Sequence, residues 1–294
     1  MNTITATRHK ILTPATTPAN NTLPNPFVVC IIGASSGIGE HIAYSYAQAG
    51  ASGIILASRR TSELTRVREK ARSLSLSPKT RVEIFPCDIS LSSNISNLAI
   101  YIRETFGRLD ICIPNSGYAG PVTLRVTDGD PAWFQANFDV NMMGTYNCAH
   151  YLIPLLLESE NSAKGFIQIG SLAANLTNGP IANTGYCVSK FAQSRFVEIL
   201  GSQFGGEGLV AVTVHPGAVA TPMAVGNTPD VFLPYLVDSV DLCGGFCVWL
   251  SKNINDLKWL NGRFLDARWD VDELLGRKED VVEKDLLKWD LRTS

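Results

Sequence analysis

The sequence lacks the features that mark several large classes of protein. It holds 25 Lys and Arg against 27 Asp and Glu, and the net charge of −2 gives no positive field for nucleic acid or an anionic membrane. No run approaches the roughly 20 apolar residues that span a bilayer. The first 26 residues contain no apolar secretory core. We therefore expect no nucleic-acid partner, no membrane partner and a cytoplasmic location.

Cysteine and histidine are also poorly placed for a metal site. The chain has 7 cysteines and 4 histidines, with no CxxC pair and no Cys/His spacing typical of zinc. His215 has no metal-spaced partner, so we interpret it as structural. No metal is expected, and several cysteines in apolar runs predict buried free thiols in a reducing compartment.

The segment 1–26 differs in composition from the rest of the chain. It is rich in Thr, Asn and Pro, and it contains Arg8 and Lys10 but no acidic residue. This composition predicts a flexible extension. A mitochondrial transit peptide stays open as the alternative.

From residue 27 onward, apolar runs alternate with amphipathic segments. The runs 27–32, 53–57, 81–86, 109–113, 166–169 and 209–214 predict strands, and the segments 37–48, 61–76, 91–106, 133–157 and 185–204 predict helices. This alternation predicts an α/β fold of the Rossmann type. We expect one domain over 27–294, with a doubly wound parallel sheet of about seven strands, helices on both faces and a ligand at the carboxyl ends of the strands.

A glycine-rich turn follows the first predicted strand and opens the first helix. Glycine lets the backbone approach a pyrophosphate, and the helix N-terminus supplies free N–H donors. A Gly-rich turn alone is weak evidence, but its place between a strand and a helix strengthens it. The residues expected to bind the cofactor here are Gly33, Ser35, Ser36, Gly37, Ile38 and Gly39.

The end of the second predicted strand indicates which dinucleotide binds. An NAD site normally places an acidic residue there to bond the ribose 2′-hydroxyl. This chain has Ser58, Arg59 and Arg60 instead. A guanidinium can pair with a 2′-phosphate, so NADP(H) is the expected cofactor. The alternative is that both arginines are solvated residues at a helix start.

With these motifs in place, the chain resembles the short-chain dehydrogenase/reductase family from residue 27 to about residue 270. Departures include Ile32 where Thr is usual, Pro114 where the first Asn is usual, and Gly170 in place of a second Ser. The tail from Gly262 to Leu275 resembles those of fungal members. The resemblance implies further cofactor contacts from Asp88, Asn115, Gly117, Pro216, Gly217, Val219 and Thr221.

The resemblance also implies a catalytic set of Asn141, Ser171, Tyr186 and Lys190. Tyr186 and Lys190 are four residues apart, which places them on one helix face, and both would also contact the cofactor. Tyr186 would be the acid/base, and the Lys190 charge would lower its pKa. Ser171 would hold the substrate oxygen. Asn141 would hold a water that links Lys190 to solvent.

Beyond Thr221, the segment 222–240 mixes structure breakers with apolar residues, which predicts a lid over a substrate site. The expected pocket walls are Tyr118, Leu172, Ala173, Met223, Phe232 and Tyr235. The substrate would be a medium-sized, mostly apolar carbonyl compound or secondary alcohol. Relatives pair through the two long helices, so we expect a homodimer or homotetramer.

The sequence thus predicts an NADP(H)-dependent ketoreductase or alcohol dehydrogenase. Two other classes stay open. The first is a non-redox enzyme on the same scaffold, such as a dehydratase, epimerase or cyclase. The second is a dinucleotide-sensing regulator without turnover, against which the intact Ser171, Tyr186 and Lys190 argue. Fold alone does not decide between them.

Overall fold

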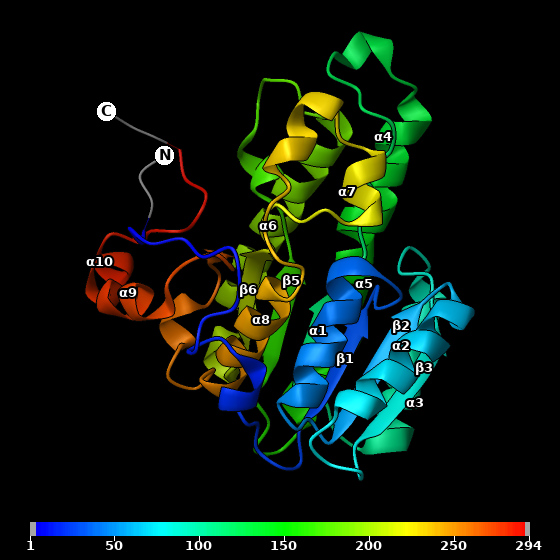
Figure 1. Cartoon of the computed structure of the whole chain (residues 1–294), viewed down its shortest axis with the longest axis vertical. Helices are drawn as coiled ribbons and strands as arrows, with labels where there is room; N and C mark the ends of the chain where they lie inside the picture. The colour runs from blue at the N-terminus through cyan, green and yellow to red at the C-terminus, as the bar shows by residue number, and fades with distance from the viewer. Residues whose placement is uncertain (1–3, 292–294) are drawn as a thin grey trace.

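The computed structural model describes residues 4–291 and contains one parallel sheet in the order β3-β2-β1-β4-β5-β6-β7. The strands are β1 Val28–Ile32, β2 Gly53–Ser58, β3 Arg81–Pro86, β4 Ile111–Pro114, β5 Gly165–Ile169, β6 Val210–His215 and β7 Phe264–Asp266. The order runs outward from β1 in both directions, so the connections pass over both faces (Figure 1). The predicted α/β doubly wound sheet is confirmed.

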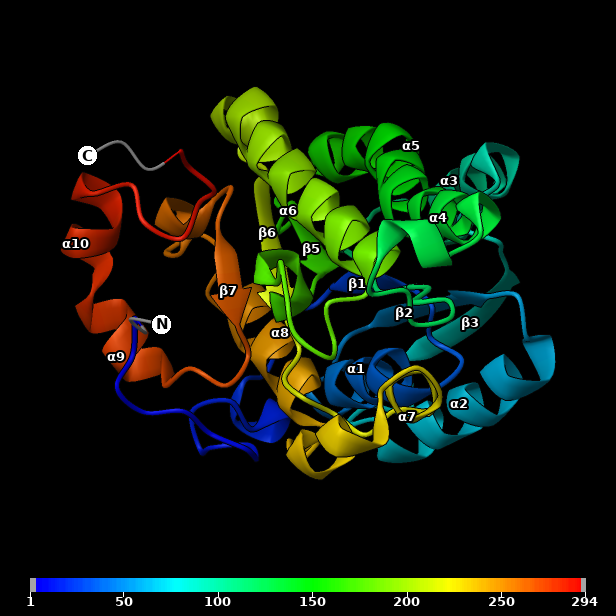
Figure 2. The ribbon, with the colours of Figure 1, turned by 90° about the horizontal axis from the view of Figure 1, so that it is seen from above.

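Helices cover both faces of this sheet. The helices are α1 Gly37–Gln48, α2 Thr61–Leu74, α3 Ser92–Phe106, α4 Pro131–Asn137, α5 Gly144–Glu158, α6 Thr184–Phe204, α7 Pro222–Gly226, α8 Leu242–Lys252, α9 Val271–Gly276 and α10 Lys278–Glu283. Viewed from above, α3, α5 and α6 lie on one side of the sheet and α1, α2 and α8 on the other (Figure 2). Each face has its own apolar core.

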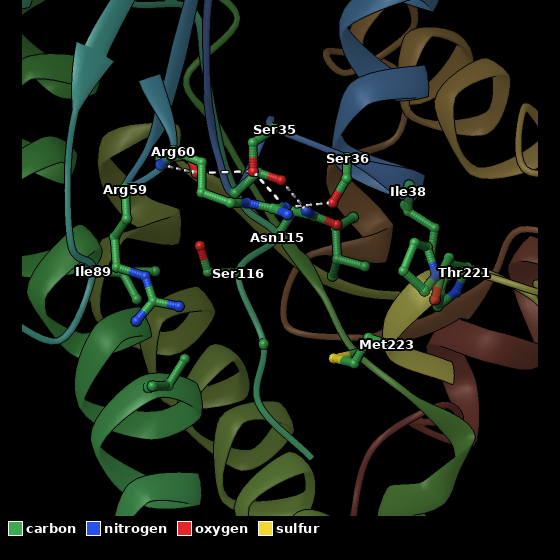
Figure 3. A pocket seen from close by; sticks show the side chains of 18 of the residues that line it. Ser35, Ser36, Ile38, Arg59, Arg60, Ile89, Asn115, Ser116, Thr221 and Met223 are labelled. Carbon is green, nitrogen blue, oxygen red and sulfur yellow. Dashed lines mark hydrogen bonds between the residues drawn. The ribbon is translucent and has the colours of Figure 1, made fainter. Parts of the chain in front are cut away.

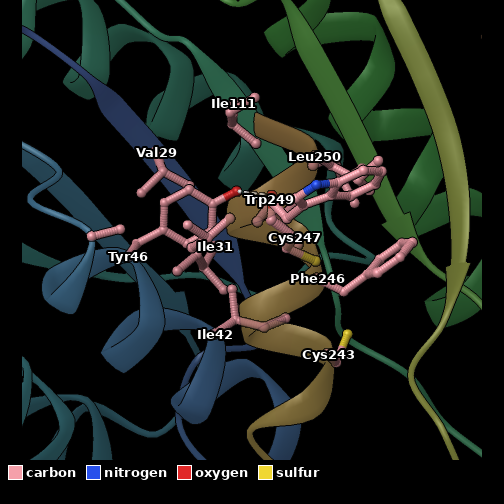
Figure 4. Packing of buried hydrophobic residues seen from close by; sticks show 14 of the residues in the cluster. Val29, Ile31, Ile42, Tyr46, Ile111, Cys243, Phe246, Cys247, Trp249 and Leu250 are labelled. Atoms are coloured by element: carbon pink, nitrogen blue, oxygen red, sulfur yellow. Dashed lines mark hydrogen bonds between the residues drawn. The ribbon is translucent and has the colours of Figure 1, made fainter. Parts of the chain in front are cut away.

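The core between β1, α1 and α8 shows why these elements hold together. Ile31 and Ile42 are fully buried there, and Phe246, which extends from the other side of α8, is buried in the same apolar cluster (Figure 4). The Tyr46 hydroxyl is also buried, and it hydrogen-bonds the Ser251 hydroxyl at 2.5 Å. A buried tyrosine needs such a partner, because an unpaired hydroxyl in an apolar core is costly. All seven cysteines, which lie in the described part of the chain, are free and buried.

The helix predicted over 133–157 is continuous, but it widens in its middle. The structure has α4, then a π-helical turn from Phe138 to Met143, then α5. The Asn141 side chain bonds the backbone of Tyr118 in the middle of this turn, which is one way such a local widening is stabilised.

The N-terminal segment is expected to be flexible, whereas residues 4–26 pack along α8 and the C-terminal helices (Figure 1). The Ser239 N–H donates to the Lys10 carbonyl at 2.7 Å, and the Leu23 N–H donates to the Ala49 carbonyl at 2.9 Å. Gly245 of α8 permits this contact, because a Cβ there would lie 2.4 Å from the Thr16 carbonyl oxygen. The segment therefore forms part of the domain's packing.

Candidate active site

A cleft of about 370 Å³ opens at the carboxyl ends of the strands, where the fold predicts a ligand. It gathers most of the residues expected to bind a cofactor (Figure 3). Those residues are Gly33, Ser35, Ser36, Gly37, Ile38, Ser58, Arg59, Arg60, Asp88, Asn115, Gly117, Tyr186, Lys190, Pro216 and Thr221. Met223, an expected substrate wall, lines the cleft too.

The glycine-rich turn is shaped by close backbone contacts. Gly33 has a φ of +94°, which is strained for other residues. At Gly39, a Cβ would lie 2.2 Å from the Gly33 carbonyl oxygen. The Asn115 amide donates to that same oxygen at 2.9 Å and so ties β4 to the turn. Gly39 is thus required for packing rather than for lining the cleft.

A group of hydroxyls and one guanidinium lies along the turn. Arg60 Nη2 donates to Ser35 Oγ at 3.0 Å and to Ser36 Oγ at 2.7 Å (Figure 3). The Ser58 hydroxyl donates to Ser35 Oγ at 2.9 Å. Arg59 stands beside them with 75% of its side chain exposed. This arrangement offers positive charge and several donors to an anionic group.

Asp88 faces the same end of the cleft. Its carboxylate accepts from the Ser90 N–H at 3.0 Å and from the Ser90 hydroxyl at 2.7 Å. Its other oxygen lies 3.8 Å from the Arg59 guanidinium. Asp88 therefore orders the turn after β3 and also holds Arg59 loosely near the cleft.

Tyr186 and Lys190 line the same cleft from the first turns of α6. Burial raises the pKa of Tyr186, and a hydrogen bond with Ser171 acts against that rise. Ser171 also accepts a bond from the Ala173 N–H at 3.1 Å, which fixes its hydroxyl at the start of the loop after β5. The two hydroxyls thus meet beside the cleft.

The expected lowering of the Tyr186 pKa by Lys190 is not what the structure shows. Lys190 Nζ lies 5.7 Å from the Tyr186 ring centre and donates to the Ile169 carbonyl at 3.1 Å. Burial lowers the pKa of Lys190 to about 7, so its ammonium is only partly present near neutral pH. Burial therefore dominates the titration of both groups.

Asn141 lies where the sequence predicts, but its side chain has protein partners. Its amide oxygen accepts from the Tyr118 N–H at 2.8 Å, and its amide nitrogen donates to the Tyr118 carbonyl at 2.9 Å. The same nitrogen donates to Ser189 Oγ at 2.9 Å. These bonds brace the loop after β4 against α6, and the water-holding role of Asn141 stays a prediction.

Several expected residues stand outside the cleft wall. Gly217 and Val219 lie in a turn that Asp238 holds by accepting the Ala218 N–H at 2.6 Å. Of the expected substrate walls, Tyr235 is exposed. The remaining expected walls that do not line the cleft are Tyr118, Leu172, Ala173 and Phe232.

Sequence reasoning missed some lining residues. These are Cys87, Ile89, Ser116, Val140, Ile169, Gly170 and Pro222. Each of these residues lies within or next to a motif of the sequence analysis, so proximity to a motif could have identified them.

His215 is interpreted as structural. Its Nδ1 accepts the Leu172 N–H at 3.3 Å, one residue beyond Ser171. Burial lowers the His215 pKa to about 4, which keeps this acceptor neutral.

Neither a metal site nor a membrane span is found in the described residues. Within 4–291, no three His, Cys, Asp or Glu side chains are grouped to hold a metal ion. Over the same range, no helix is long and apolar enough to cross a bilayer.

Solved structures with the same fold include two dehydrogenases. A putative short chain dehydrogenase from Escherichia coli, complexed with NADPH, is 26% identical, has a TM-score of 0.72, and the match covers 84% of this chain and 99% of that one. A 7α-hydroxysteroid dehydrogenase complexed with NADH and 7-oxo glycochenodeoxycholic acid is 23% identical and has a TM-score of 0.73. The match covers 85% of this chain and 95% of that one. The second likeness concerns the fold alone.

Sequence relatives lead to the family. The short chain dehydrogenase pgmD of Aspergillus terreus is 38% identical over 97% of this chain and 93% of its own length. The short chain dehydrogenase andI of Emericella variicolor is 35% identical over 90% of this chain and 89% of its own length. The profile of the short chain dehydrogenase family matches residues 27–231. The chain therefore belongs to the short-chain dehydrogenase family, and its relatives include fungal members.

Proposed function

We propose that this protein is an NADP(H)-dependent ketoreductase or alcohol dehydrogenase. The observation that carries the proposal is the arginine and serine group at the end of β2, where an NAD site would have an acidic residue. Arg60 bonds Ser35 and Ser36, and Arg59 remains largely exposed at the cleft. These residues fit a 2′-phosphate. The E. coli structure with NADPH supports a nicotinamide dinucleotide.

Tyr186 moves the proton in this proposal. A nicotinamide dinucleotide held by the cleft residues would supply or accept the hydride. Tyr186 donates its phenolic proton to the carbonyl oxygen as negative charge develops there, and the Ser171 hydroxyl holds that oxygen. Lys190 in its ammonium form stabilises the phenolate that remains. An anion bound in the cleft would favour that form, because a nearby negative charge raises the pKa of a lysine.

The substrate proposed is a medium-sized, mostly apolar ketone or secondary alcohol. Met223 of α7 lines the cleft, and Val225 of the same helix is exposed beside it. The segment 222–240, which contains α7 and a 3₁₀ helix over Asp230–Tyr235, is proposed as the lid. The hydroxysteroid dehydrogenase with the same fold holds a large ketone.

We also propose a homodimer or homotetramer in a reducing compartment, the cytoplasm. Exposed apolar side chains follow the outer faces of α5 and α6, among them Tyr146, Phe191 and Ile199. Such a surface favours association with another copy. The buried free cysteines fit a reducing compartment.

Fluorescence titration with NADPH and NADH tests the cofactor assignment. Arg59→Ala should weaken NADPH binding about tenfold and leave NADH unchanged, because one charge-assisted hydrogen bond is worth about 1.5 kcal/mol. Arg60→Ala should weaken both, since it also releases Ser35 and Ser36. The matched control is Arg103→Ala, because its exposed side chain pairs with Glu158 and neither residue lines the cleft.

Two outcomes would count against the proposal. Equal affinity of the wild type for NADPH and NADH would remove the NADP assignment. Binding of neither dinucleotide would favour the non-redox enzyme classes.

A further inference from the structure

We propose that a second cavity, beside the start of α6, binds the end of the substrate remote from its reacting carbonyl, and that this end is an apolar, ring-sized group bearing a hydrogen-bond donor. The inference rests on the proposed function. The cavity has a volume of about 240 Å³. Its walls are Pro121, Thr123, Val126, Gly129, Asp130, Pro131, Trp133, Phe134, Asn137, Asn183, Thr184 and Gly185.

The walls are mostly apolar and partly open to solvent. Trp133 and Phe134 of α4 are 39% and 40% exposed, and Val126 is 76% exposed. Two aromatic rings and an aliphatic side chain around one hollow form an apolar site of the kind that small ligands use. A volume of 240 Å³ is below the ~300 Å³ at which cavities for whole ligands begin, so it fits part of a molecule.

Hydrogen bonds fix this cavity to the catalytic helix. The Asn183 amide donates to the Ala119 carbonyl at 2.8 Å, and the Thr184 N–H donates to the Thr123 carbonyl at 2.9 Å. The loop that forms one wall is therefore held directly at the first residues of α6. A preformed wall lowers the ordering cost of binding.

Asn137 gives the cavity a specific chemical preference. Its side chain is buried, and its amide nitrogen donates to the Trp133 carbonyl at 2.9 Å, which sets the orientation of the amide. Its amide oxygen has no hydrogen-bond partner within residues 4–291. Buried acceptors without a partner are rare in folded proteins. The oxygen is shielded in the cavity, so a ligand hydroxyl or N–H would supply the missing donor after a small shift of the partly exposed Trp133 or Phe134 side chain.

The cavity and the catalytic cleft share two supports. Gly185 lines the cavity and Tyr186, the next residue, lines the cleft. Asn137 lines the cavity, and Val140, about one turn further along, lines the cleft. The cleft wall consists largely of residues that fit a dinucleotide, so a substrate needs further room near Tyr186. The second cavity provides it.

Calorimetric titration with 2-naphthol and 2-methoxynaphthalene tests this inference, with and without saturating NADP+. The wild type should bind 2-naphthol about fivefold more tightly than the methoxy compound, because one neutral hydrogen bond is gained. Val126→Trp fills the cavity from an exposed position and should weaken 2-naphthol binding at least tenfold. Leu124 is exposed on the same loop but does not line the cavity, so Leu124→Trp should change the affinity for 2-naphthol less than twofold.

Either of two results would overturn the inference. If Val126→Trp and Leu124→Trp bind 2-naphthol equally, the cavity is not the site. If the two probes bind the wild type equally, Asn137 does not select a donor. Failure of the proposed function would show separately as loss of NADPH binding by the wild type, which the cavity variants are expected to leave unchanged.

Discussion

Asn141→Ala distinguishes a bracing role from a water-holding role. The Asn141 side chain is fully buried and makes three hydrogen bonds, two to the Tyr118 backbone and one to Ser189. Each neutral bond contributes about 1 kcal/mol, and the Tyr118 N–H would lose its acceptor. The substitution should therefore lower the free energy of unfolding by ~3 kcal/mol. It should also lower turnover, because the loop and α6 would lose their common support.

Urea unfolding followed by circular dichroism measures the loss, with the slope of the transition checked for two-state behaviour. The control is Asn227→Ala, which removes a single exposed bond to the Met223 carbonyl and should cost less than about 0.5 kcal/mol. A variant that keeps its stability within about 1 kcal/mol while losing turnover would refute the bracing role and restore the water relay.

Two further predictions concern buried groups of the cleft. Burial lowers the pKa of Lys190 in the folded protein from 10.5 to about 7. Between pH 7 and pH 10.5 the amine is therefore protonated in the unfolded chain but mostly neutral in the folded protein. As the pH rises from 7 to about 9, the free energy of unfolding of the wild type, measured with urea, should therefore increase by ~1–2 kcal/mol relative to that of Lys190→Met. If the free energies of unfolding of the two proteins change in parallel with pH, the lowered pKa of Lys190 is contradicted. Gly39→Ala places a Cβ 2.2 Å from the Gly33 carbonyl oxygen and should cost ~2–3 kcal/mol together with at least tenfold in NADPH affinity. Gly206→Ala, which meets no atom within 4 Å, is its control, and equal thermal midpoints for the two variants would disprove the steric argument.

The sheet and most helices could be predicted because their signal is local. β1 and β2 are fully buried apolar runs, and the helix between them follows directly from the glycine-rich turn. The parallel order then follows from the alternation of strands with helices. The cleft could be located for the same reason, since each turn after a strand faces the same edge of the sheet.

Features that depend on distant partners could not be predicted in this way. Asp110 looks like a loop or cap residue in the sequence, but its buried carboxylate accepts the Val28 N–H at 2.8 Å and pairs with Arg108. The packing of the N-terminal segment depends on Gly245, some 230 residues later. The π-helical turn depends on the Tyr118 backbone. No periodicity in one segment records contacts of this kind.

The two halves of the site differ in how far the sequence determines them. On the dinucleotide side, the ligand meets backbone turns whose place is set by the ends of strands, and Arg60 needs only neighbouring hydroxyls to be positioned. On the substrate side, walls come from loops, where side-chain direction follows no fixed period. Composition predicts Phe232 and Tyr235 there, yet their rings pack against each other at a tilt and do not line the cleft, whereas Trp133 and Asn137 line a second cavity. On the proposed function, we therefore predict that substrate choice depends on the loop after β4 and the first turns of α4 and α6 together with the proposed lid, and that changes there alter specificity while the cofactor site is retained.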